Sequence, residues 1–229
     1  IYGESVSWSG LYFIATGVGL NTVSYSSNGT IWAGLGTNVF SSIGQNSFSQ
    51  VINKDTLAYS TNNGTTWTGL GFTIFSNQTN SICSGENLFV GVGKGEINTI
   101  AYSSNGTQWT GLGKTIFSTQ GNGIATSGLF FVAAGQGVNS LAYSLGGTQW
   151  IGLGTSTFTT GSSVYWTGIY YIAGGSGSNS FAYSSNGISW TGFGTTLFYV
   201  LGNGSYAQKI NIDTNSFVSV GVGSSNTIA

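Results

Sequence analysis

The stretch YSSNGTQW at residues 102–109 decides the fold, because close versions of it recur along the chain. The other copies are YSSNGTIW (25–32), YSTNNGTTW (59–67), YSLGGTQW (143–150) and YSSNGISW (183–190). Each copy ends in a tryptophan, and successive tryptophans lie about 40 residues apart. A period of this length is typical of propeller blades and solenoid coils, so the sequence predicts a repeat protein.

Each copy of the motif sits inside a longer unit that has the pattern of four short strands. An apolar segment such as LFFVAAG (129–135) precedes the motif, and a G-[LF]-G step follows it. Helix is disfavoured, because the β-branched and aromatic runs are broken by glycine and show no 3.6-residue apolar period. In the unit 114–154 the boundaries fall at Gly, Asn, Ser or Thr, and the expected strands are Ile116 to Ala125, Leu129 to Ala134, Ser140 to Ser144 and Gln149 to Leu153.

The repeat predicts a single all-β domain, a β-propeller of six blades with four antiparallel strands each. The last blade is expected to lack its outer strand, because Ala229 aligns with Ala182, which directly precedes a copy of the motif. Such an open edge presents unpaired backbone groups and would accept a strand donated by a partner. Five or seven blades, or a window from a longer array, are the alternatives. The six units cover approximately residues 1–36, 37–71, 72–113, 114–154, 155–194 and 195–229.

The copy at 59–67 has the form S-x-N-x-G-x-T-W and resembles the Asp-box repeat of sialidase-like propellers, with asparagine in place of aspartate. The resemblance covers all five hairpins and implies a structural motif that lies away from any active site. The motif's own chemistry supports this, because asparagine accepts backbone N–H groups, glycine supplies a positive φ and tryptophan packs under the turn. The predicted structural turn residues are Asn28, Gly29, Trp32, Asn62, Gly64, Trp67, Asn105, Gly106, Trp109, Gly147, Trp150, Asn186, Gly187 and Trp190.

The complete unit has the pattern G-x-G-x-N-[TS]-[ILVF]-A-Y-S-x-N-G-x-x-W-x-G-[LF]-G. This pattern spans nearly the whole chain and resembles low-charge repeat proteins of large DNA viruses of protists. The resemblance implies a capsid-associated or fibre-like role at a virion surface, and it carries no activity with it.

The composition excludes several kinds of chemistry. The chain has no His, no Arg, one Cys, four Lys and five acidic residues. General acid–base work by histidine, Ser–His triads and His/Cys metal sites are therefore excluded, as is the arginine clamp that sialidases use for their substrate. Four scattered lysines cannot neutralise a phosphate backbone, so nucleic acid is not an expected partner. No cofactor, metal or membrane insertion is expected.

One catalytic option remains, a pair of carboxylates for glycoside cleavage. The repeat alignment places only Asp55 and Glu96 in loops of adjacent units, and this pair alone is geometrically plausible. A glycosidase is nevertheless the least favoured interpretation, and the chain is predicted not to be an enzyme. The single thiol, Cys83, is expected to be a small buried side chain rather than a reactive one. The acidic residues considered are Glu4, Asp55, Glu86, Glu96 and Asp213.

Two groups of polar residues are candidate ligand-binding sites. The first is a charged group in the loops between the second and third strands and between units, for which a solvated rim of ion pairs is the favoured interpretation and a ligand or partner contact the alternative. The second is an asparagine repeated between the second and third strands, for which turn capping is favoured over binding of sugar hydroxyls. The charged group comprises Lys54, Asp55, Lys94, Glu96 and Lys114. The repeated asparagines are Asn21, Asn98, Asn139, Asn179 and Asn226.

The favoured function is a non-enzymatic structural or interaction module, displayed on a virion or cell surface or secreted. Its expected partners are other structural proteins or surface glycans, and a multivalent carbohydrate-binding propeller is the alternative. A net charge of −1 with 4% charged residues offers little repulsion between molecules and suits an assembly. Sequons would matter only in a compartment with the glycosyltransferase, and they occur at Asn28, Asn63, Asn77, Asn105 and Asn203.

Overall fold

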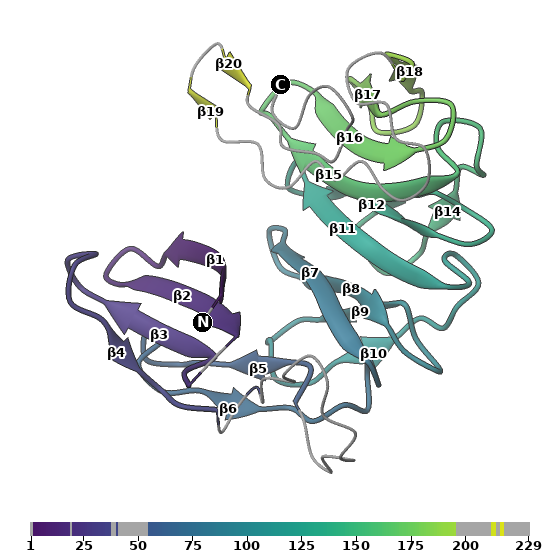
Figure 1. Ribbon diagram of the computed structural model, residues 1–229. Coiled ribbons are helices and arrows are strands. Elements are labelled where there is room, and N and C mark those ends of the chain that lie inside the picture. The colour runs from purple at the N-terminus through teal and green to yellow at the C-terminus, as the bar shows by residue number, and fades with distance from the viewer. Residues whose placement is uncertain are drawn as a thin grey trace. The chain divides into compact units, whose positions relative to one another are not determined.

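The structure is a computed structural model that describes residues 2–18, 20–37, 40, 55–195, 212–213 and 216–217 (Figure 1). The described residues form strands and turns and contain no helix, so the prediction of an all-β chain is confirmed for this part. The chain divides into two compact units, Ile1–Thr73 and Ile74–Ala229, and each unit is described by itself.

The first unit contains one four-stranded antiparallel sheet and one two-stranded sheet. In both sheets a copy of the motif connects the last two strands, because its turn residues follow the tyrosine-containing strand directly. The four-stranded sheet has the order β1-β2-β3-β4 and comprises β1 (Tyr2–Trp8), β2 (Phe13–Val18), β3 (Val23–Ser26) and β4 (Ala33–Gly34). The smaller sheet pairs β5 (Ala58–Tyr59) with β6 (Thr68–Gly69).

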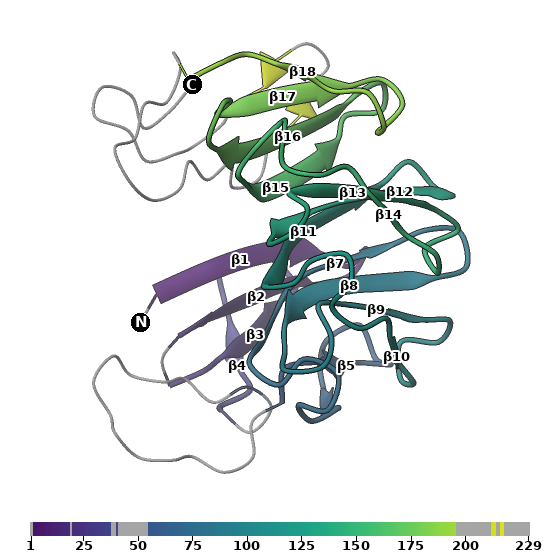
Figure 2. The same ribbon diagram turned by 90° about the vertical axis from the view of Figure 1, so that its right-hand side faces the viewer.

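The second unit contains three four-stranded antiparallel sheets, which stack face to face in both views (Figures 1 and 2). The first comprises β7 (Gln78–Ser84), β8 (Phe89–Lys94), β9 (Ile100–Ser103) and β10 (Thr110–Gly111). The second comprises β11 (Gln120–Thr126), β12 (Phe130–Gln136), β13 (Leu141–Leu145) and β14 (Ile151–Gly152). The third comprises β15 (Thr160–Trp166), β16 (Tyr171–Ser176), β17 (Phe181–Ser184) and β18 (Thr191–Gly192). A further short pair joins β19 (Ile212–Asp213) to β20 (Ser216–Phe217).

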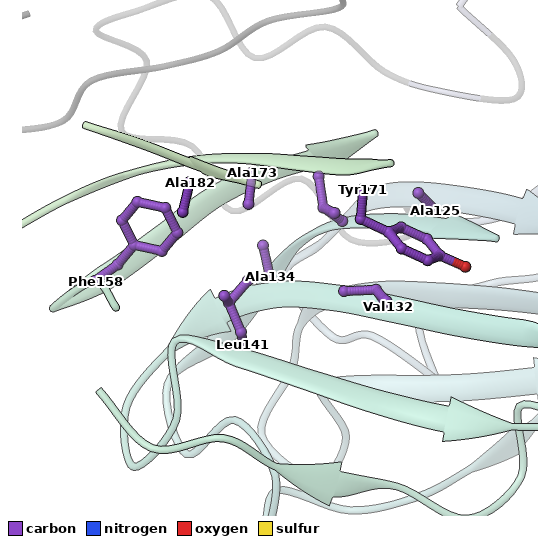
Figure 3. Close-up of a cluster of buried hydrophobic side chains, with 9 residues drawn as sticks. Ala125, Val132, Ala134, Leu141, Phe158, Tyr171, Ala173 and Ala182 are labelled. Atoms are coloured by element: carbon purple, nitrogen blue, oxygen red, sulfur yellow. The ribbon is translucent and has the colours of Figure 1, made fainter. Parts of the chain in front are cut away.

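The core of the second unit lies between the stacked sheets. Along β12, Phe131 and Ala133 pack toward the β7–β10 sheet, whereas Val132 and Ala134 pack toward the β15–β18 sheet. Figure 3 shows the second of these clusters, with Tyr171 of β16 lying above Val132. Because successive side chains on a strand point to opposite faces, the continuous apolar run at 129–135 indicates a sheet buried on both sides.

The first strand of each four-stranded sheet carries an irregularity in its pairing with the second strand. The register shifts lie between Gly3 and Ser5, Thr79 and Ser81, Gly121 and Gly123, and Gly161 and Ser163. Each shift leaves one residue of the first strand unpaired, as in a β-bulge, and a bulge turns that side chain away from the regular alternation.

Two expected strands of the unit 114–154 differ from the structure. The first strand begins at Gln120 rather than near Ile116, and the buried Phe117 lies in the segment that leads into it. The last strand spans two residues instead of running from Gln149 to Leu153. Most of the sixth unit, 195–229, lies outside the described residues.

Candidate functional site

The turns of the motif are closed by their own side chains. In residues 103–109, Ser103 Oγ accepts a hydrogen bond from the Gly106 N–H (2.8 Å) and donates one to Asn105 Oδ1 (3.1 Å). Asn105 Oδ1 also accepts two backbone N–H groups further along the turn (3.0 and 2.9 Å). The Trp109 indole N–H donates to the Gly106 carbonyl (3.0 Å). The acceptor capacity of the asparagine oxygen is therefore used within the turn.

The other copies repeat this arrangement with two variations. In the longer loop at 59–67, Asn62 Oδ1 accepts one backbone N–H group, from Thr66 (2.9 Å). In the copy at 143–150 no asparagine is present, and Ser144 Oγ alone accepts the Gly147 N–H (3.0 Å). The Oδ1 atoms of Asn28 and Asn186 each accept two backbone N–H groups, as Asn105 Oδ1 does. The indole N–H of every motif tryptophan donates to the carbonyl of the motif glycine, in the pairs Trp32–Gly29, Trp67–Gly64, Trp109–Gly106, Trp150–Gly147 and Trp190–Gly187.

The motif glycines of the β11–β14 and β15–β18 sheets pack against the preceding sheet. A Cβ atom at Gly147 would lie 2.8 Å from Leu88 of the β7–β8 turn and 2.9 Å from Val90 of β8. A Cβ atom at Gly187 would lie 2.5 Å from Phe130 and 2.6 Å from a methyl carbon of β12. These distances are far below ordinary carbon–carbon contact, so only glycine lets the turn approach the neighbouring sheet this closely.

Three of the asparagines between the second and third strands, Asn98, Asn139 and Asn179, each bind two backbone groups of their own repeat. Asn139 Oδ1 accepts the Gly154 N–H (2.8 Å), and Asn139 Nδ2 donates to the Ile116 carbonyl (2.7 Å). The amide thereby ties the end of the fourth strand to the segment that enters the first. Asn98 binds Gly113 and Ile74, Asn179 binds Gly194 and Thr157, and Asn21 accepts the Gly36 N–H. Asn226 lies outside the described residues.

These amide bonds give a physical reason for the repeated G-[LF]-G step. A Cβ atom on Gly152 would occupy the space of the Asn139 amide group. Gly154 has a φ of +70° and donates its N–H to the same amide. The asparagine and the two glycines therefore form one structural device, and this geometry favours turn capping over sugar binding for these residues.

The charged group is divided between the two units. Asp55 belongs to the first unit and takes the place of the repeated asparagine, because its Oδ1 accepts the Gly71 N–H. Lys94, the last residue of β8, and Glu96 are exposed, and Lys114 is half-buried after β10. Lys54 lies outside the described residues. Since the units are described separately, the pairing of Asp55 with Glu96 stays a prediction.

The sequence patterns did not identify two asparagines that connect neighbouring sheets. Asn80, at the irregularity in β7, donates its Nδ2 to a glycine carbonyl of β11 (2.7 Å). Asn122, at the irregularity in β11, donates in the same way to a glycine carbonyl of β15 (2.7 Å). The sequence signal is the repeated Gln-x-Asn pattern at 78–80 and 120–122, because each glutamine Nε2 donates to the Oδ1 of its asparagine.

A buried tyrosine makes a further connection between sheets. The Tyr171 hydroxyl of β16 lies 2.8 Å from the Phe130 carbonyl and accepts the Ser127 N–H (3.0 Å) of the β11–β12 turn. Burial raises the pKa of Tyr171. The neutral hydroxyl therefore serves as a structural hydrogen-bonding group between the β11–β14 and β15–β18 sheets.

The single thiol gives a pH-dependent prediction. Burial raises the pKa of Cys83 from 9.0 to about 12. The folded chain therefore holds this proton more tightly than the unfolded chain, so its contribution to stability is complete below pH 9 and is lost as the pH rises toward 12. Within that window we expect this group to lower the free energy of unfolding by up to about 1.4 kcal/mol per pH unit.

Chemical denaturation of the wild type and of Cys83→Ala across the same pH range measures this contribution. In the variant, the free energy of unfolding is expected to fall less steeply with rising pH, because the thiol is absent. The tyrosines titrate in both proteins and contribute equally to both curves. An identical alkaline slope in both proteins would contradict the assignment.

Two searches of the described residues give negative results. No group of three or more His, Cys, Asp or Glu side chains is placed to hold a metal ion in the described ranges. Within the same part of the chain, no helix is long and apolar enough to cross a membrane.

Comparison with solved structures places the fold among β-propellers. YCF48 bound to D1 peptide matches with a TM-score of 0.61 and 13% identity, covering 96% of this chain and 74% of that chain. YCF48 from Cyanidioschyzon merolae matches with a TM-score of 0.60 and 16% identity, covering 99% and 80%. The nidogen/laminin complex matches with a TM-score of 0.53 and 12% identity, covering 78% and 73%. No protein-family model matches the chain, and no curated protein sequence matches it. The similarity therefore concerns the β-propeller fold alone.

Proposed function

We propose that the chain is a non-enzymatic structural or interaction module, displayed on a virion or cell surface or secreted. One observation carries the proposal: the polar side chains that the repeat places most regularly bind the chain's own backbone. The motif asparagines close turns, the asparagines between the second and third strands tie each unit together, and Asn80 and Asn122 join neighbouring sheets. Such residues build a scaffold, which leaves contacts with partners to the exposed turns.

We further propose six blades for the propeller. The number follows from the tandem unit, which fits six times into the chain when the last copy lacks its outer strand. The four-stranded sheets of both described units and the similarity to solved propellers support the blade as the repeating element. An experimental structure with five or seven blades would contradict this number.

A polypeptide is the partner that we favour over a glycan. Two of the similar propeller structures are complexes with a polypeptide, YCF48 bound to D1 peptide and the nidogen/laminin complex. Of the amides first considered for sugars, Asn98, Asn139 and Asn179 have both the oxygen and one N–H bound internally. A glycan array with the purified chain separates the alternatives, and specific binding to one class of glycan would support the lectin.

Surface display has a direct test in the native source. Antibodies against the purified chain are expected to label the outer surface of intact virions or cells, seen by immunogold electron microscopy. Permeabilised particles provide the control for buried antigen. Labelling that appears only after permeabilisation would contradict the proposal.

The proposal also predicts that the chain cleaves no glycosidic bond. A hydrolysis assay on chromogenic glycosides is expected to show no activity above the buffer rate. A rate that is present in the wild type and lost in the Asp55→Asn, Glu96→Asn double variant would establish the glycosidase alternative.

A further inference from the structure

Exposed apolar side chains gather at one end of two adjacent sheets in the second unit. In an antiparallel meander, the turn after the first strand and the turn after the third strand lie at the same end of the sheet. In the β11–β14 and β15–β18 sheets these four turns carry large exposed hydrophobic residues. We call them the tip patch, which comprises Leu129, Leu145, Ile169, Tyr170 and Ile188.

The tip patch is continuous across the seam between the two sheets. Within the first sheet, the Gly146 N–H donates to the Leu129 carbonyl (2.8 Å), so its two turns meet. From the second sheet, the turn at Gly187 packs on Phe130, the residue after Leu129. The Tyr171 hydroxyl is bonded to the Phe130 carbonyl (2.8 Å) and brings the β15–β16 turn to the same place. All four turns therefore border one surface.

The tip patch is also free of charge. The turns at 127–130, 144–149, 167–170 and 184–189 contain no Lys, Asp or Glu. The opposite end of the neighbouring β7–β10 sheet differs, because Lys94 ends β8, Glu96 follows it and Lys114 follows β10. One carboxylate borders the patch, because Glu86 Oε1 of the β7–β8 turn lies 3.9 Å from the position of a Cβ atom on Gly128. Apart from this one border residue, a strongly charged partner would find no complementary charge in the four turns.

We propose that the tip patch binds a second copy of this chain, an inference that rests on the proposed function and names its partner. Two copies repel each other little, because the net charge is −1 and 4% of residues are charged. A two-fold arrangement places the same uncharged patch on both molecules, so each apolar side chain meets an apolar surface. Tyr170 adds an aromatic side chain of the kind that is enriched at interface cores.

Sedimentation velocity over a concentration series of the purified chain tests the proposal. The wild type is expected to form a dimer, and the double variant Leu145→Lys, Ile169→Lys to weaken dimerisation at least about a hundredfold. Ile97→Lys is the matched control, because Ile97 is 72% exposed, compared with 71% for Leu145 and 69% for Ile169, and lies beside Glu96 at the other strand ends. Circular dichroism and thermal unfolding confirm that each variant is folded.

Three outcomes would overturn the proposal: a wild type that stays monomeric throughout, a double variant that associates like the wild type, or a control that weakens association equally. Binding of a monomeric wild type to neutral phosphatidylcholine vesicles would assign the patch to a membrane instead. If the double variant does not fold, amide hydrogen exchange of the wild type at increasing protein concentration tests the proposal instead. Dimerisation through the patch must slow exchange in the four turns as the concentration rises, and an unchanged rate would overturn the proposal. A dimer without surface labelling would refute the display proposal alone.

Discussion

Replacing Gly147 with alanine is expected to lower the free energy of unfolding by about 3 kcal/mol, the largest single-residue effect that we predict. Gly147 has a φ of +80°, and a side chain there costs about 1–2 kcal/mol in the left-handed region. The added carbon would also overlap Leu88 and Val90 of the preceding sheet, and overpacking of this kind costs about 1–3 kcal/mol. Denaturant unfolding of the purified variant measures the sum.

Gly146→Ala is the matched control, one residue earlier in the same turn. Gly146 has a φ of +83°, but a Cβ atom there would meet nothing within 4 Å. This variant is therefore expected to lose only the backbone part, about 1–2 kcal/mol. Equal losses at the two positions would show that packing of the turn against the β7–β10 sheet contributes little.

Asn139→Asp is expected to have the next largest effect, a loss of about 2–3 kcal/mol at neutral pH. The oxygen that accepts the Gly154 N–H is kept, but the donor to the Ile116 carbonyl becomes a carboxylate oxygen facing another acceptor. Protonation restores a donor, so the loss is expected to shrink as the solution is acidified. Denaturation of the wild type and the variant at neutral and acidic pH tests both parts, and a loss independent of pH would contradict the role of the donor.

The reverse exchange in the first unit is the companion variant. Asp55 occupies the repeated asparagine's place and its carboxylate accepts the Gly71 N–H, so Asp55→Asn keeps an oxygen acceptor but replaces a charge-assisted hydrogen bond with a neutral one. We expect a loss of about 0.5–1.5 kcal/mol in the free energy of unfolding at neutral pH. Unchanged or higher stability would show that the charge of the carboxylate contributes nothing at this position.

The sequence predicted the strands of the repeat because its periodicity and turn residues are local properties. The motif YSSNGTQW combines a strand-forming tyrosine with Asn-Gly at the bend, and the structure places a turn between β9 and β10 at this point. The apolar run at 129–135 likewise corresponds to β12. Similarity to solved propellers supports the architecture that was expected from the tandem unit.

Other features were not predictable, because they depend on which groups the fold brings together. Gln-x-Asn at 78–80 and 120–122 is an ordinary polar sequence until a bulge aims the asparagine at the next sheet. For the repeated asparagine at Asn139 turn chemistry favoured a cap over a ligand site, but the two backbone groups that it binds could not be named from the sequence.

The extent of the fourth strand was overestimated for a related reason. The backbone of residues 149–154 stays hydrogen-bonded to the β13 side, through Leu153 N–H to Leu141 and Ser140 N–H to Gly154, but regular strand pairing covers only Ile151–Gly152. The tip patch was missed because alternation along strands describes the core, whereas the exposure of Leu145 at the end of β13 and of Ile169 in a turn depends on which sheets stack.

The short fourth strands of the sheets affect how copies of the chain associate at high concentration. β4, β10, β14 and β18 each span two residues, so the outer edge of each described four-stranded sheet offers another chain only a short row of backbone donors and acceptors. Extension of a sheet from one molecule into the next, a usual cause of aggregation in β-rich chains at high concentration, needs a longer edge strand than this. Many copies can therefore pack side by side at high concentration without their outer strands pairing between molecules.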